Sequence, residues 1–512
     1  MSTHSEDNKR IAKNTMLLYG RMGLMMIISF FTARITLEAL GVDNYGINNV
    51  VGGLVSMFSL ISGSLTSSAS RFITYGLGAG DKERLNKIFT TSVNIHLILA
   101  IIVVLAIETI GVWFLNNKMV IPAERLTAAH WVLQCSAISF AVGLLSTPYN
   151  AAIIAHERMD VYAYFSLFDA VARLAIVFSI KYYGGDKLIL LAVISLIPML
   201  IKQLYYWRFS KKKFEECTYR FKWDNKLFKE MTSFAGWNFI GSTAAQMKDQ
   251  GVNIAINMFH TPAVNAARGI AMQICGIVGQ FTGNISVAIN PQITKEYAAG
   301  NYSRMHNLMF KGTKILYFLF MTISIPIFFE IETILNIWLG QVPEHTVLFT
   351  RLVLILCLSD TLAGTLITAQ LATGRIRNYQ IVVGGTLLLN FPISYILLRS
   401  GFFPEITLVI AIIISQICLI ERLLFLRTMV KLPSLKFAKE VYLTTIIVTI
   451  IASITPAILY CNLHESIIRF FLVCTSSAIS SFATIYIIGL KKDEKRIALQ
   501  YVRRFINKLK RL

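Results

Sequence analysis

The feature that most constrains this chain is a nearly unbroken series of about fourteen apolar stretches between Thr15 and Leu490, each roughly 20 to 28 residues long. A helix needs about 20 residues to cross the ~30 Å hydrocarbon layer of a bilayer. Charged residues make up only 15% of the chain, against about 25% in ordinary globular proteins. The sequence therefore predicts an all-α polytopic membrane protein, with spans at 14–38, 46–73, 88–115, 126–154, 160–181, 187–207, 230–259, 263–290, 310–333, 346–372, 378–399, 403–426, 440–461 and 467–490.

The distribution of basic residues predicts how these spans are oriented. A net charge of +21 could indicate nucleic-acid binding, but Lys and Arg gather in alternate loops, and the loops between them are short and poor in cations. The positive-inside rule then predicts that both termini are cytoplasmic. The basic groups are Lys9, Arg10 and Lys13; Arg71, Lys82, Arg84 and Lys87; Arg158; Arg208 to Lys226; Lys295 and Arg304; Arg375 and Arg377; Arg427, Lys431 and Lys436; and nine residues of the tail 491–512.

The tail and the cysteines allow further expectations. We interpret the basic tail as an orientation signal, with binding of anionic lipid or a partner as the alternative. Arg21 interrupts the first apolar stretch after a polar start, which argues against a cleavable signal peptide. Six of seven cysteines lie in or near spans or on the cytoplasmic side, and there is no C-x-x-C pair. Neither a disulfide nor a metal site is therefore expected, and no cofactor is indicated.

Two local matches at a shift of about 220 residues indicate an internal duplication. Tyr75–Arg84 parallels Tyr297–Arg304, and Ala155–Tyr162 parallels Ala372–Tyr379. Six spans separate the copies, so the repeats are parallel and form two lobes around a central cavity. We expect an N-lobe at 1–207, a basic cytoplasmic linker at 208–229, a C-lobe at 230–427, two added helices at 428–490 and a basic tail at 491–512.

Polar residues in the spans 230–259 and 263–290 point to that cavity. A stripe with spacings of three and four residues occupies about a third of the first helix. A helix facing lipid would not carry such a stripe, so it faces either a water-filled cavity, which we favour, or a polar helix–helix contact. The stripe contains Asn238, Ser242, Gln246, Asp249, Asn253 and Asn257, with Lys248 on its flank; Gln273, Gln280 and Asn284 continue it on the next span, which has Arg268 near its outer end.

Charged residues deep in the other spans are also candidates, because each costs about 2.5–3.5 kcal/mol on insertion scales. Arg21 is expected in the cavity, and Arg34 lies either there or at the interface. Asp169 and Arg173 are four residues apart and are predicted to form a structural ion pair. Asp360 is either a protonatable coupling group or an acid kept neutral by burial.

These features resemble the multidrug/oligosaccharidyl-lipid/polysaccharide exporter superfamily, and within it the bacterial flippases for O-antigen, capsule or related lipid-linked repeat units. The resemblance covers essentially the whole chain. It rests on the six-plus-six repeat, on the two added helices and on two local segments, Leu40–Gly46 and Thr147–Arg158.

The resemblance implies transport of an undecaprenyl-diphosphate-linked oligosaccharide from the inner to the outer leaflet of the bacterial cytoplasmic membrane by alternating access. It also implies arginines that hold the diphosphate in a cationic cavity. Arg21, Arg34 and Arg268 occupy comparable helices, and we add Lys248 to this set. The amide and hydroxyl stripe would hold the glycan. Asp249 and Asp360 are the candidates for coupling to protons or sodium, and the transporter is expected to be a monomer.

The sequence leaves two alternative functions to compare with transport of a lipid-linked glycan. A multidrug or organic-cation antiporter of the same superfamily would need a cavity dominated by acids and aromatics, whereas bases are at least as numerous here. A glycan polymerase or glycosyltransferase is disfavoured, because the longest extramembrane segment, 208–227, is too short to fold a catalytic domain. The chain is therefore not expected to be an enzyme.

Overall fold

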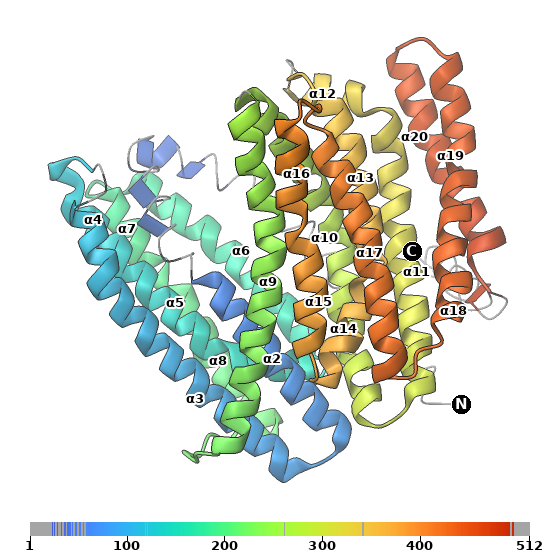
Figure 1. The fold of residues 1–512 in the computed structure, drawn as a ribbon. Coiled ribbons are helices and arrows are strands. Elements are labelled where there is room, and N and C mark those ends of the chain that lie inside the picture. The colour runs from blue at the N-terminus through green and yellow to red at the C-terminus, as the bar shows by residue number, and fades with distance from the viewer. Residues whose placement is uncertain are drawn as a thin grey trace, which may run out of the picture. The chain divides into compact units, whose positions relative to one another are not determined.

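The computed structural model describes residues 58–491 apart from 118, 120, 261, 340 and 341, together with 494, 495 and scattered positions between 23 and 55. Within these residues the secondary structure is helical and no strand occurs. The chain forms two compact units, residues 1–243 with 287–301 and residues 244–286 with 302–512. Figure 1 shows the helices of both units.

The first unit is built around α5, which packs against α2, α3, α7 and α8. Its helices are α2 (Ser59–Ala79), α3 (Lys82–Ala106), α4 (Val112–Asn117), α5 (Leu126–Ala155), α6 (Met159–Tyr182), α7 (Lys187–Ile194) and α8 (Leu196–Lys213). Asp81 caps α3 by accepting a hydrogen bond from the backbone N–H of Arg84. A buried apolar cluster around Val132 and Leu133 fills the space between these helices.

Two long helices contribute to both units. α9 (Asn225–Phe259) places its first part in the first unit and its remainder in the second, and α10 (Pro262–Ala298) gives its C-terminal part to the first unit. The units change at residues 243 and 287, and the expected lobes at 1–207 and 230–427 stay a prediction.

In the second unit, α17 packs against α13, α14, α15 and α16, while α11 packs against α13, α19 and α20. The remaining helices are α11 (Tyr302–Phe329), α12 (Ile331–Leu339), α13 (Thr346–Thr361), α14 (Gly364–Thr373), α15 (Arg377–Leu388), α16 (Asn390–Arg399), α17 (Ile406–Met429), α18 (Ser434–Phe437), α19 (Thr444–Asn462) and α20 (Ile467–Thr484). α19 and α20 lie side by side (Figure 1).

Ten helical segments among the described residues are long and apolar enough to cross a membrane, and each overlaps a predicted span. They are Lys82–Asn117, Ala123–Ala155, Lys187–Lys213, Val264–Ala298, Tyr302–Phe329, Thr346–Thr373, Arg377–Arg399, Ile406–Met429, Ser434–Asn462 and Ile467–Gly489. The all-α polytopic fold is thus confirmed. α2, α6 and α9 also overlap predicted spans, and most of the predicted span 14–38 lies outside the described residues.

The two duplicated segments have the same backbone geometry at their turns. Gly80 after α2 and Gly300 after α10 both adopt φ of 75°. Glu157 after α5 has φ of 57°, and Gly374 after α14 has φ of 73°. Each pair therefore ends its helix with a residue in the left-handed region, the usual way to stop a helix.

Candidate functional site

Arg268 is the most deeply buried of the predicted binding residues that the structure describes. Only 4% of this α10 residue is exposed. Its Nη1 donates a hydrogen bond to Asn253 Oδ1 on α9, and Asn265 Nδ2 donates to the Asn253 carbonyl at 3.2 Å. The buried Nε of Arg268 has no hydrogen-bond partner among the described residues. A guanidinium with an unused buried donor is suited to an anionic oxygen.

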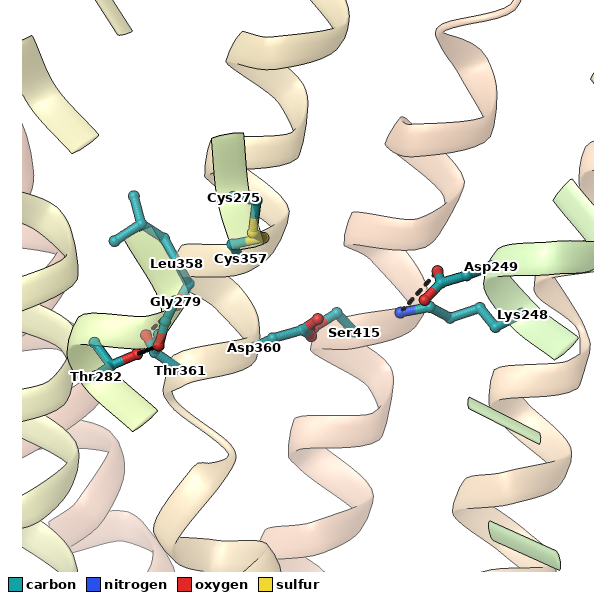
Figure 2. The surroundings of a disulfide bond; sticks show 10 residues. All are labelled: Lys248, Asp249, Cys275, Gly279, Thr282, Cys357, Leu358, Asp360, Thr361 and Ser415. Carbon is teal, nitrogen blue, oxygen red and sulfur yellow. Dashed lines mark hydrogen bonds and ion pairs between the residues drawn. A yellow bond between two sulfur atoms is a disulfide. The ribbon is translucent and has the colours of Figure 1, made fainter. Parts of the chain in front are cut away.

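Lys248 and Asp249 lie beside each other on α9, in the second unit (Figure 2). Lys248 is buried, and its Nζ lies 4.0 Å from Asp249 Oδ1. The Asp249 side chain is 38% exposed. Asn390 Nδ2 donates a long hydrogen bond, 3.5 Å, to the Lys248 carbonyl. The contact between the charges is loose, so both groups retain capacity for another partner.

Asp360 lies at the point where a membrane helix breaks, between α13 and α14. Its Oδ1 accepts a 2.6 Å hydrogen bond from Ser415 Oγ on α17. Ser415 is 2.7 Å from Ser359 Oγ, which accepts from Gln416 Nε2 at 2.6 Å. Tyr442 donates its hydroxyl proton to Gln416 Oε1 at 2.8 Å. The result is a continuous chain of hydrogen bonds whose donors can all point toward one carboxylate.

The break gives Asp360 a second distinctive environment. α13 ends at Thr361 and α14 begins at Gly364, so backbone carbonyls at this end of α13 leave the regular helical pattern. The C-terminal end of a helix carries a partial negative charge. Together with the exposed Asp360 carboxylate, it favours a bound cation or proton.

The same region contains a disulfide that the sequence analysis did not expect. Cys275 of α10 is bonded to Cys357 of α13, with the Cα atoms 6.7 Å apart (Figure 2). The expectation of no disulfide was wrong, because it relied on cysteine spacing along the chain. The pair is 82 residues apart in sequence and meets only through helix packing. No cluster of three or more His, Cys, Asp or Glu that could hold a metal occurs among the described residues.

The first unit has its own polar pocket, with a volume of about 320 Å³. Asp169 lines it but takes Lys202 of α8 as its partner, with Oδ2 and Nζ 2.8 Å apart. The expected pair of Asp169 with Arg173 was therefore wrong, because an amine on a neighbouring helix approaches more closely than the guanidinium one turn away. Arg173 is exposed at the same pocket. Its walls are Met25, Gly143, Ser146, Thr147, Asn150, Asp169, Arg173, Met199, Lys202 and Tyr206.

The predicted glycan stripe is divided between the two units. Asn238 and Ser242 are partly buried and belong to the first unit, whereas the rest belong to the second. There, Gln246, Gln273 and Gln280 are exposed, and Asn253 and Asn284 are partly buried. Arg21 and Arg34 lie outside the described residues. The structure thus brings Arg268 and Asn253 together. The side chains of the other described stripe residues in this unit range from partly buried to exposed.

Close contacts tie the C-terminal part of α10 to the rest of the first unit. Glu157 is buried and accepts hydrogen bonds from Lys295 Nζ at 2.9 Å and Gln292 Nε2 at 3.3 Å. Its positive φ is uncommon for a residue with a side chain. The Tyr75 and Tyr297 rings also meet, with centroids 6.2 Å apart. The hydrogen bonds from Lys295 and Gln292 therefore hold Glu157 in its strained backbone conformation.

Comparison with known proteins identifies the family of this chain. The sequence model of the family described as "Polysaccharide biosynthesis protein" matches residues 11–332. The chain belongs to this family. The expected resemblance to a polysaccharide family is thereby confirmed. The uncharacterized membrane protein EpsK of Bacillus subtilis (strain 168) is 17% identical over 293 residues, which are 57% of this chain and 58% of EpsK.

Solved transporters share the fold at low sequence identity. A MATE transporter in the bent conformation superposes with a TM-score of 0.72 at 13% identity, covering 84% of this chain and 97% of the other. A MOP superfamily transporter from Pyrococcus furiosus superposes with a TM-score of 0.69 at 12% identity, covering 83% of this chain and 96% of the other. A multidrug resistance MATE transporter in an outward-facing conformation superposes with a TM-score of 0.70 at 13% identity, again covering 83% of this chain and 96% of the other. These likenesses confirm the fold and leave the substrate open.

Several residues of these sites were missed from sequence. Lys202 lies in the apolar run 187–207, so the rule that selected Arg268 would also have selected it. The same rule would have found Glu330, which is fully buried and binds Arg469 at 3.0 Å. No sequence signal could have indicated the bond between Cys275 and Cys357.

Proposed function

We propose that this polysaccharide biosynthesis protein moves an undecaprenyl-diphosphate-linked oligosaccharide from the inner to the outer leaflet of the bacterial cytoplasmic membrane. Two lobes would give alternating access, both termini would be cytoplasmic, and the glycan would serve surface polysaccharide synthesis. The observation that carries the proposal is Arg268, a buried guanidinium with an unpartnered Nε beside an asparagine in the membrane. Guanidinium groups bind diphosphate oxygens, and the amide groups suit sugar hydroxyls.

Charge in the other polar pocket supports an anionic cargo. Arg173 and Lys202 line it with a single carboxylate, Asp169. A charge at the bilayer centre is retained only at considerable cost, so cations in excess of anions favour a negatively charged ligand. Lys248 and the remaining stripe residues complete the proposed binding set.

Coupling to an ion is proposed to use Asp249 and Asp360. Asp360 is supported by the hydrogen-bond chain through Ser415 and by its position at the helix break. Asp249 is supported by its partial exposure and loose contact with Lys248. Asp360→Asn and Asp249→Asn should each leave substrate binding in place but remove the dependence of transport on an imposed proton or sodium gradient. Full gradient-driven transport by both variants would contradict the assignment.

The proposal is tested in proteoliposomes with a fluorescent diphosphate-linked prenyl oligosaccharide, by following its exposure at the far leaflet. Arg268→Gln should reduce initial transport at least tenfold, because a charge-assisted hydrogen bond contributes about 1.5–3 kcal/mol. Arg351→Gln is a matched control, since Arg351 sits in the same unit but already bonds Glu332 and Tyr460. Unchanged transport by Arg268→Gln would refute the proposed role of the arginine.

The second candidate is an organic-cation antiporter, which the fold shared with a multidrug resistance transporter favours. The same proteoliposomes separate the two, because a cationic dye should move only if this alternative holds. In cells, loss of surface polysaccharide after deletion, with drug tolerance unchanged, supports the flippase.

A further inference from the structure

A second cavity, of about 710 Å³, lies in the first unit, away from the predicted membrane centre. It forms between the start of α3 and the segment that follows α8. Its base is apolar and buried, made by Leu85 and Phe214. The complete lining is Leu77, Lys82, Glu83, Leu85, Asn86, Lys87, Thr90, His156, Lys213, Phe214, Glu215, Glu216, Thr218, Arg220 and Lys222. None of these residues belongs to the transport site proposed above.

Three polar residues follow one face of α3 at intervals of four, and the first two, Asn86 and Thr90, line this cavity. Asn86 donates to the carbonyls of Glu216 and Thr218 at 2.8 and 3.0 Å. Asn94 donates to the Lys222 carbonyl at 3.2 Å. Thr90 lies between the two asparagines, is only 1% exposed, and its Oγ1 has no hydrogen-bond partner among the described residues. A buried hydroxyl left unpaired is costly, so a ligand that accepts its proton would be favoured.

The rim carries more positive than negative charge. Five lysine and arginine residues face three glutamates, and two of those glutamates are already engaged. Glu215 pairs with Lys82 at 2.9 Å, and Glu216 binds His156 Nε2 at 2.6 Å. Four exposed cations have no ion pair within the described part of the chain: Lys87, Lys213, Arg220 and Lys222.

The segment after α8 is held firmly enough to form a binding wall. The His156 ring stacks on Phe214, with centroids 3.9 Å apart and planes within 3°. Burial acts to raise the pKa of Glu216, but the hydrogen bond from His156 and a backbone N–H outweigh it, and its pKa lies below its ordinary value. The carboxylate is therefore ionised at neutral pH and holds the imidazole. The cavity is thus shaped before a ligand arrives.

We propose that this cavity binds a phosphate-bearing anion, with Thr90 donating a hydrogen bond at its base and the unpaired cations at its rim. The anion is either the headgroup of an acidic phospholipid or a soluble phosphate compound. Both offer the same oxygens, which suit lysine and arginine donors. Acidic lipids are concentrated where basic segments adjoin membrane helices.

The test uses the full-length protein in nanodiscs. In one arm, saturable binding of labelled inorganic pyrophosphate is measured in phosphatidylcholine discs at two salt concentrations. In the other, discs contain phosphatidylglycerol, and native mass spectrometry counts the lipids retained after transfer to detergent. Three variants are compared with wild type: Lys87→Gln/Lys222→Gln, Thr90→Val, and the control Lys211→Gln/Lys212→Gln, which removes two exposed charges outside the cavity.

We expect Lys87→Gln/Lys222→Gln to weaken the binding of one of the two probes at least tenfold and to reduce the salt dependence of that binding. Thr90→Val should weaken the binding of the same probe about fivefold. The control pair should stay within about twofold of wild type. Retained phosphatidylglycerol identifies a lipid ligand, and pyrophosphate binding identifies a soluble one. Absence of saturable binding by both probes, or equal loss in the rim and control pairs, overturns the proposal. If Thr90→Val fails to fold, the comparison of Lys87→Gln/Lys222→Gln with the control pair tests the proposal by itself. Transport in proteoliposomes, which tests the proposed function, can fail independently of this outcome.

Discussion

Replacing Gly78 with alanine should destabilise the first unit, because α2 and α10 touch there without room for a side chain. A Cβ at Gly78 would lie 2.7 Å from the Lys295 carbonyl oxygen, 2.8 Å from Lys295 Cα and 2.8 Å from Ala298 Cβ. Ordinary contacts begin near 3.4 Å, so the overlaps are about 0.6 to 0.7 Å. Two of these atoms are helix backbone and cannot rotate away. The end of α10 must therefore move.

The expected magnitude follows from two opposing effects. Overpacking costs about 1–3 kcal/mol, whereas alanine gains about 1 kcal/mol over glycine in helix propensity. The net effect of Gly78→Ala is therefore a loss of up to about 2 kcal/mol. Gly63→Ala in the same helix is the matched control, because nothing lies within 4 Å of its added Cβ. It should keep or raise stability by up to about 1 kcal/mol.

Thermal unfolding of the purified variants in detergent provides the measurement. A domain of 150–250 residues shifts by about 2–4 °C per kcal/mol, so the two variants should differ by several degrees, with Gly78→Ala the less stable. The moved α10 end would also weaken the pair of Lys295 with Glu157. Glu157→Gln should then cost less in the Gly78→Ala background than in wild type. Equal melting temperatures for Gly78→Ala and Gly63→Ala would refute the reasoning.

Three other predictions concern contacts outside this region. Arg469→Leu should cost about 3–5 kcal/mol, because it leaves the fully buried Glu330 without its partner; Glu330→Leu/Arg469→Leu should recover much of that loss in thermal unfolding. The intact mass of Cys275→Ala/Cys357→Ala should not change on reduction, whereas wild type should gain two hydrogens from this bond; equal alkylation of both cysteines before and after reduction would contradict the disulfide. Glu216 has a lowered pKa, so its contribution to stability is present above the ordinary glutamate value near 4.3 and lost as pH falls through the folded value. The difference in melting temperature between wild type and Glu216→Gln should therefore shrink on acidification, and a difference independent of pH would argue against an ionised carboxylate.

Membrane spans were predictable because each is encoded locally. A run of apolar residues long enough to cross the bilayer must form a helix, since every backbone polar group has to be satisfied within the segment. The predicted span 126–154 and α5, Leu126–Ala155, differ by one residue at the C-terminal end. α11 begins at Tyr302, eight residues before the predicted start at 310, because a helix can continue beyond the apolar layer.

Partners were not predictable, because they depend on which helices lie next to each other. The sequence placed Asp169 one turn from Arg173 on a single helix, but packing brought Lys202 from α8 closer. The bond between Cys275 and Cys357 arose in the same way. Hydropathy and charge along the chain determined the all-α membrane architecture, since the bilayer acts on each segment separately. Tertiary structure alone decided the ion pairs, the disulfide and the anion cavity, since each joins residues that only helix packing brings into contact.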